Sequence, residues 1–221
     1  MTPSRPQAST VVHHPIFARF YQRFAAAAME KGERDHRSEM LAGLTGRVIE
    51  VGAGPGLNFD LYPESVTEVL AVEPEAILRR GAEQAAGRAP VPVRVVDGVA
   101  DALPAEDASF DAGVASLVLC SVPDQAAALA ELHRVIRPGG ELRFYEHVLA
   151  HSPRFARAQH VVDPVWTRVA GGCHLDRDTA AAIETAGFRI GSIRRFSFHV
   201  SLIDRLAAPQ IVGAARRPEH A

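Results

Sequence analysis

Short apolar runs recur along the chain between segments of mixed polarity, and each run has the length of a buried strand. The runs that predict strands are Val48–Val51, Val69–Val72, Val93–Val96, Ala112–Leu119, Glu141–Tyr145, Arg189–Phe198 and Ile211–Arg216. The segments that predict helices are Ala76–Ala86, Pro123–Ile136 and Thr179–Ala186, with a turn at residues 137–140 and Gly187 as a helix C-cap. This alternation predicts an α/β fold with a doubly wound, mostly parallel, seven-stranded sheet.

The 221 residues are enough for one domain with a full core. Residues 1–14 are predicted to be disordered, and residues 15–221 to form a single domain. Apolar residues at helical spacing over residues 15–44 predict a helix that either packs on the domain or acts as a lid, with Tyr21 facing the ligand. Residues 149–178 predict a less regular insert that covers the substrate.

Composition argues against several classes of function. The 24 basic and 26 acidic residues give a net charge of −2, so no basic field indicates a nucleic-acid partner. No apolar stretch reaches the roughly 18 residues of a membrane-spanning helix, so no integral membrane segment is expected. Two cysteines, Cys120 and Cys173, fit a reducing cytoplasm better than a disulfide scaffold. Ten histidines are present, but without H-E-x-x-H or C-x-x-C spacing, and we expect no metal.

A glycine-rich turn follows the first predicted strand, with the sequence Glu50-Val51-Gly52-Ala53-Gly54-Pro55-Gly56. Glycines allow the backbone to bend sharply and to approach a ligand closely. The pattern is E-x-G-x-G-x-G and not the G-x-G-x-x-G of dinucleotide binders, and a carboxylate aimed into the turn would repel phosphate. The turn therefore favours a cationic or hydroxyl-rich ligand, such as the amino-acid end of S-adenosylmethionine.

A second acidic residue, Glu73, ends the next apolar run, 17 residues after Gly56. This distance leaves room for one helix between two parallel strands. An acid at the end of the second strand can accept hydrogen bonds from both hydroxyls of an adenosyl ribose. The alternative is a solvated carboxylate at a strand end.

Several motifs together resemble a known family. The glycine turn is similar to motif I, and Glu73 to the acid of motif II, of the class I S-adenosylmethionine-dependent methyltransferases. Ser109-Phe110-Asp111 and the segment Leu132–Gly140 look like sequences of the "type 11" group. The resemblance covers about Leu44 to Phe188 and implies a Rossmann-like fold. It also implies that Glu50, Gly52, Gly54, Gly56 and Glu73 bind S-adenosylmethionine, with S-adenosylhomocysteine as the product.

The predicted adenine loop departs from the family pattern. Many type 11 enzymes place Asp directly before an Ala, where it meets the exocyclic amine of adenine, and this chain has Val99 there. Asp101, or Asp97 in its place, could contact the amine instead. Asp101 could equally cap a turn.

A narrower resemblance points to the acceptor. Four segments occur in the order found in the methyltransferase-like-seven group of alkyl-thiol S-methyltransferases: Leu117–Val122, Tyr145–Val148, Asp163–Trp166 and Gly172–Leu175. Those animal enzymes carry an N-terminal membrane helix, and this chain is expected to depart from them in that feature. The resemblance implies transfer of a methyl group to a small, partly apolar thiol.

Thiol methylation requires a thiolate, because the thiol itself is a poor nucleophile, and so requires a base or a positive field. His147 directly follows the fifth strand and is the first candidate, although it could instead make a structural hydrogen bond. His174 and Asp163 lie in the insert, and Asp163 could alternatively cap a helix that starts at Pro164. Leu119 and the backbone after it are expected to face the donor, and Cys120 to end a buried strand as a small packed residue.

Other functions remain open at this stage. A quinone or a lipid headgroup could replace the thiol as the methyl acceptor, on carbon or nitrogen. A non-catalytic sensor could hold the cofactor without transferring its methyl group, and a dehydrogenase would need the missing G-x-G-x-x-G turn. The only partner expected is a small-molecule acceptor. The protein is expected to be a monomer or a homodimer.

Overall fold

The computed structural model describes residues 24–25, 27–201 and 203–219, and these contain one seven-stranded sheet. Its strands are β1 (Gly46–Val51), β2 (Val66–Val72), β3 (Val93–Val96), β4 (Phe110–Ser116), β5 (Ile136–His147), β6 (Arg189–Ser197) and β7 (Pro209–Arg216). Their order is β3-β2-β1-β4-β5-β7-β6, and only β7 runs antiparallel to its neighbours. The predicted doubly wound, mostly parallel sheet is confirmed. The strand order reverses between β1 and β4, where ligands of such sheets bind.

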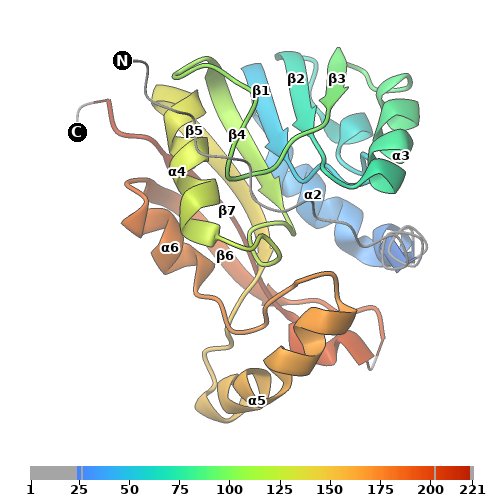
Figure 1. Cartoon of the computed structure of the whole chain (residues 1–221), viewed down its shortest axis with the longest axis vertical. Helices are drawn as coiled ribbons and strands as arrows, with labels where there is room; N and C mark the ends of the chain where they lie inside the picture. The colour runs from blue at the N-terminus through green and yellow to red at the C-terminus, as the bar shows by residue number, and fades with distance from the viewer. Residues whose placement is uncertain (1–23, 26, 202, 220–221) are drawn as a thin grey trace, which may run out of the picture.

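The helices are η1 (Met29–Glu33), α2 (Arg34–Leu41), α3 (Ala76–Ala86), α4 (Gln125–Val135), α5 (Pro153–Val169) and α6 (Thr179–Thr185), with short 3-10 turns η2 (Phe59–Leu61) and η3 (Ile203–Ala207). Figure 1 shows α5 (orange) apart from the sheet, at the bottom of the view. Among the described residues, every helix is too short or too polar to span a lipid bilayer.

Two hydrophobic clusters cover the two faces of the sheet. Because successive side chains of a strand point to opposite faces, neighbouring residues of β1 enter different clusters. Ile49 and Val51 pack in the cluster that includes α4 and α6, whereas Val48 packs with α2 and α3. The strands are therefore buried on both sides, which explains why they read as continuous apolar runs.

Two strand boundaries differ from the prediction. Strand β4 ends at Ser116 and not at Leu119, because Leu117 takes a left-handed conformation with φ of 54°. The predicted turn at residues 137–140 lies inside β5, because Ile136 already pairs with Phe110 before the register shifts to Glu141 opposite Ala112. The turn is thus a local irregularity of a longer strand.

The prediction for residues 149–178 was wrong in its main feature. A 17-residue helix, α5, occupies most of this segment and begins at Pro153, after Ser152. Asp163 and Pro164 lie within α5, so Asp163 does not cap a helix start. Proline usually marks a helix end, whereas Pro164 lies inside α5. The buried carboxylate of Asp163 instead accepts a hydrogen bond from the Leu175 N–H at 2.6 Å and so holds the loop that follows α5.

The predicted N-terminal helix falls partly outside the described residues, as does Tyr21. The described part is helical except for a kink at Gly32, and it ends with α2 at Leu41. Arg37 of α2 is buried, and it donates hydrogen bonds to Glu33, Asn58 and Ser116. This network ties the N-terminal helix to the ends of β1 and β4.

We expect Gly213→Ala to lower the free energy of unfolding by about 1–3 kcal/mol through overpacking. A Cβ atom at Gly213 of β7 would lie 2.2 Å from the Ser192 carbonyl oxygen and 2.7 Å from the Phe144 ring. Gly191→Ala on the neighbouring strand is the matched control, because its nearest contact would be an ordinary 3.8 Å from the Ala214 carbonyl. Denaturant unfolding measures both; equal stability of the two variants would contradict this packing.

Candidate functional site

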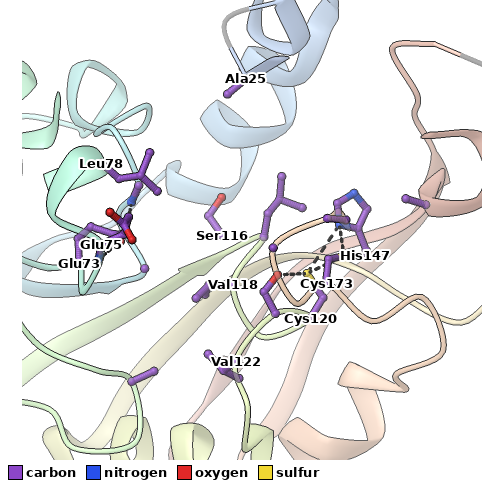
Figure 2. Close-up of a pocket in the computed structure, with 18 of the residues that line it drawn as sticks. Ala25, Glu73, Glu75, Leu78, Ser116, Val118, Cys120, Val122, His147 and Cys173 are labelled. Carbon is purple, nitrogen blue, oxygen red and sulfur yellow. Dashed lines mark hydrogen bonds between the residues drawn. The ribbon is translucent and has the colours of Figure 1, made fainter. Parts of the chain in front are cut away.

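A cavity of about 540 Å³ lies at the carboxyl ends of the central strands. Residues that follow β1, β2 and β4 line it, together with the last residue of β5 and residues of α5 and the N-terminal segment. Figure 2 shows Glu73 and Glu75 on one side, and Cys120, His147 and Cys173 on the other. The cavity therefore has two ends of different chemistry.

The glycine turn forms part of the first end. Gly52, Gly54 and Gly56 have φ angles of 62°, 57° and 83°, which L side chains rarely adopt. A Cβ atom at Gly52 would also lie 2.3 Å from the Val118 side chain. Gly52 and Gly54 line the cavity, so bare backbone is exposed to a ligand there.

Glu73 is fixed beside the turn by two backbone amides. The Gly54 N–H donates to Oε2 at 2.8 Å, and the Glu75 N–H donates to Oε1 at 2.9 Å. A carboxylate has about four acceptor positions, so it can still accept hydroxyl hydrogen bonds from a ligand. Burial raises the pKa of Glu73, against the effect of the two amides.

The two adenine candidates are placed differently. Asp101 lines the cavity, close in sequence to Gly98, Val99 and Ala100, which also line it. Asp97 is exposed and pairs with Arg79 at 3.1 Å, and it is not among the described residues of the lining. The position of Asp101 suits an adenine contact better.

Glu50 does not point into the turn as expected. Its carboxylate is buried, and it accepts hydrogen bonds from the Asn58 amide and the Tyr62 hydroxyl, both at 2.7 Å. It is absent from the described cavity lining. Burial raises the pKa of Glu50 from 4.5 to about 7, although Tyr62, Asn58 and Arg37 each oppose the shift. Glu50 can therefore affect a ligand only indirectly, through Asn58 and Tyr62, which follow the glycine turn.

The loop after β4 is held by Glu146, which the sequence analysis did not single out. Its buried carboxylate accepts hydrogen bonds from the amides of Val118, Leu119 and Cys120, at 3.0, 2.9 and 3.1 Å. Burial raises the pKa of Glu146, while these amides oppose the shift. The Leu119 side chain enters the core and not the described cavity lining, which continues with Cys120 and Ser121. Only the position of Glu146, next to His147 at a strand end, hinted at this role.

Cys120, His147 and Cys173 meet at the second end of the cavity. The two sulfurs are 3.6 Å apart, and each lies 3.7 Å from Nδ1 of His147. Cys120 lies in the loop beyond β4, and so does not end the strand as expected. Its hydrogen bond with Cys173 and its burial raise the pKa of Cys120 well above the ordinary value. Burial lowers the pKa of His147, but Cys120, Glu146 and Glu33 outweigh it and the net shift is upward.

His174 and Asp163 pair with each other, at 2.9 Å between Nδ1 and Oδ2. Neither is among the described residues that line the cavity. The His174 N–H donates to the Cys120 carbonyl at 2.8 Å, so this segment joins the loop of Cys173 to the loop of Cys120. Of the three candidate catalytic residues, only His147 faces the cavity.

Comparison with known proteins identifies the family of the chain. The family described as "Methyltransferase domain" matches residues 49–144. Thiol S-methyltransferase TMT1B of Rattus norvegicus is 35% identical over 185 residues, which cover 78% of this chain and 72% of the relative. Thiol S-methyltransferase TMT1A of Homo sapiens is 33% identical over 194 residues, covering 85% and 78%. The chain belongs to the class I S-adenosylmethionine-dependent methyltransferases.

A solved structure supports the fold of this methyltransferase. The YcgJ protein of Bacillus subtilis superposes with a TM-score of 0.68 at 17% identity, covering 84% of this chain and 99% of that one. S-adenosylmethionine is the cofactor of the family, and the site has features that fit it. The glycine turn presents backbone without side chains to the cavity at Gly52 and Gly54, and Glu73 can accept ribose hydroxyls.

We expect the stability of the methyltransferase to fall as the pH rises from about 4.5 to 7. The folded protein raises the pKa of Glu50 from 4.5 to about 7, so it binds the proton more tightly than the unfolded chain. This stabilisation is complete below the unfolded pKa and is lost as the pH rises through the folded pKa. This difference between the folded and unfolded pKa of Glu50 corresponds to about 3 kcal/mol.

The matched variant for this test is Glu50→Gln, which mimics the protonated carboxyl. Its free energy of unfolding, measured in denaturant across the same pH range, should fall less than that of the wild type. Parallel pH profiles for the two proteins would contradict the assignment to Glu50.

We expect Glu73→Gln to weaken S-adenosylmethionine binding by about 10- to 100-fold, because charged hydrogen bonds contribute about 1.5–3 kcal/mol. Calorimetric titration measures the affinity. Asp97→Asn is the control, because this exposed acid pairs with Arg79 outside the described lining. Unchanged affinity in Glu73→Gln would remove Glu73 from the ribose role.

Proposed function

We propose that this methyltransferase transfers the methyl group of S-adenosylmethionine to a small, partly apolar thiol. The observation that carries the proposal is the position of His147 and two sulfurs at the end of the cavity opposite Glu73. The thiol S-methyltransferase names of the relatives support the same acceptor class. Donor and acceptor would then occupy the two ends of one cavity.

The donor end is assigned to the glycine turn, Glu73 and Asp101, with Glu50 supporting the turn from behind. S-adenosylmethionine supplies a methyl group on a positively charged sulfur, which is already a good leaving group. The protein has to align the nucleophile with that methyl group. The loop held by Glu146 provides a fixed part of the cavity lining, through Val118 and Cys120.

The acceptor end is assigned to His147, as the group that favours the thiolate. Its imidazole lines the cavity, where a bound thiol could give up its proton. Apolar residues such as Val118 and Val122 also line the cavity and would exclude water from the reacting sulfur. The indole Nε1 of Trp166 is buried without a hydrogen-bond partner among the described residues, and could donate to a polar atom of the acceptor.

His174 and Asp163 are assigned a positioning role. Asp163 accepts hydrogen bonds from both His174 and the Leu175 N–H, and it thereby fixes the loop that carries Cys173. Residues 15–44 remain a predicted lid, since Phe24 and Ala25 line the cavity. The cytoplasmic setting also remains a prediction.

A second candidate acceptor is a quinone or a lipid headgroup. Val161, Val165 and Val169 repeat every four residues on α5 and are 74%, 62% and 67% exposed. Val169 also lines the cavity. An apolar acceptor or a membrane surface could use this stripe, and co-sedimentation with liposomes would detect such binding.

Product analysis by mass spectrometry distinguishes these acceptors. The full chain is incubated with methyl-labelled S-adenosylmethionine and a panel of small thiols, quinols and phosphatidylethanolamine. We expect labelled thioether, and a loss of about 100-fold or more in His147→Ala, as for removal of a general base. Cofactor affinity should be unchanged in that variant.

His174→Ala is the control, because its side chain is outside the described cavity lining. It should lose less activity than His147→Ala. A loss confined to His174→Ala would identify His174 as the base. Product from quinols or lipid alone would refute the thiol acceptor, and no product from any acceptor would favour a cofactor-binding sensor.

A further inference from the structure

We propose that Cys120, His147 and Cys173 bind a zinc ion, with a fourth position open to the cavity. We further propose that the sulfur of the acceptor thiol occupies this position, a part that rests on the proposed function. The sequence analysis expected no metal, because it found no H-E-x-x-H or C-x-x-C spacing. The three residues of this cluster lie 26 to 53 positions apart in the sequence.

The distances within the cluster match a tetrahedral zinc site. With Zn–S of about 2.3 Å and Zn–N of about 2.0 Å, tetrahedral angles place two sulfurs about 3.8 Å apart and a sulfur about 3.5 Å from a nitrogen. The observed separations are 3.6 Å between the sulfurs and 3.7 Å from each sulfur to Nδ1 of His147. All three sides of the triangle therefore fit without movement of the backbone.

The donor set also selects the metal. Two thiolates and an imidazole suit zinc, whereas calcium and magnesium prefer oxygen ligands. Three protein ligands with an open fourth position are typical of catalytic zinc, while structural sites use four. All three residues line the cavity, so the fourth position can face a ligand within it.

The backbone around the ligands is fixed in advance. Glu146 holds the Cys120 amide at 3.1 Å, and the His174 N–H donates to the Cys120 carbonyl at 2.8 Å. Asp163 holds the loop after Cys173 through Leu175. Outer contacts of this kind orient metal ligands and strengthen their affinity.

A second group, Asp163, His174 and Asp176, also has metal-ligand atoms within 4.8 Å of one another. Its hydrogen bonds already have a structural explanation in the pairs His174–Asp163 and His160–Asp176. It does not line the described cavity, and it provides a control for the first group.

The zinc would take over the role assigned above to the imidazole. Two thiolates balance the double positive charge, so the loaded site is neutral. A thiol that binds as the fourth ligand releases its proton to solvent, and its sulfur lone pair then forms the new bond to the methyl carbon. The bond from that carbon to the sulfonium sulfur breaks, and its electron pair stays on that sulfur. The neutral thioether is a weaker ligand than the thiolate and can leave.

Cobalt titration of the reduced full chain tests the metal site. Cys120 and Cys173 are the only cysteines in the sequence, so thiolate-to-cobalt charge-transfer absorption reports on this cluster alone. We expect saturation near one equivalent, displacement by zinc, and visible bands of tetrahedral cobalt. Cys173→Ser should weaken binding beyond the roughly 10- to 100-fold lost with an outer-shell partner. Asp176→Asn, in the second group, should keep the absorption.

Thermal unfolding of each variant checks that it is folded. If Cys173→Ser does not fold, Cys120→Ser and His147→Gln provide independent tests of the metal site. Absence of charge-transfer absorption in the reduced wild type would overturn the site. Equal cobalt binding by the Cys120→Ser/Cys173→Ser double variant would also overturn it.

The open position is tested with 2-mercaptoethanol. Addition to the cobalt-loaded protein should change the visible bands and the thiolate charge transfer, and chelator-treated protein should lose thiol methylation until zinc is restored. Undiminished methylation by metal-free protein would refute the role of zinc and leave the thiol acceptor standing. Metal binding at the cluster without methylation of any thiol would refute the acceptor and leave the metal site standing.

Discussion

The architecture of the site depends on the buried carboxylate of Glu146. Three consecutive amides, from Val118 to Cys120, donate to it from the loop after β4. Without this acceptor the amides would lose their partners inside the protein, at a cost of about 1–3 kcal/mol for each buried group. The left-handed Leu117 turns the chain into this loop, and Glu146 then fixes where the loop goes. Both ends of the cavity take their shape from it.

The donor end contacts the same loop through the glycine turn. Gly52 leaves no room for a Cβ because Val118 lies against it, so a residue of the loop limits what can occupy the turn. The acceptor end begins two residues further on, at Cys120. One short segment therefore lies against the glycine turn and carries a side chain of the proposed acceptor end, an arrangement that would align the two reactants.

Buried polar groups connect the rest of the structure to this centre. Arg37 joins the N-terminal helix to Ser116 at the end of β4, and Asn58 joins Arg37 to Glu50 at the end of β1. Asp163 does the same for the loop that carries Cys173. Such networks specify one arrangement, because each member would lose a hydrogen bond in any other.

The sequence by itself determined the mostly parallel sheet and the nearness of the glycine turn to Glu73. Strands buried on both faces read as apolar runs, and the glycine turn and Glu73 belong to one local unit, so their spacing predicts their contact. Only the tertiary structure decided the acceptor end. Cys120, His147 and Cys173 come from three segments that are distant in the sequence. Pro164 suggested a helix start but lies inside α5, so the sequence did not predict the position of the loop that carries Cys173. Contacts between distant segments depend on packing, which a local pattern does not encode.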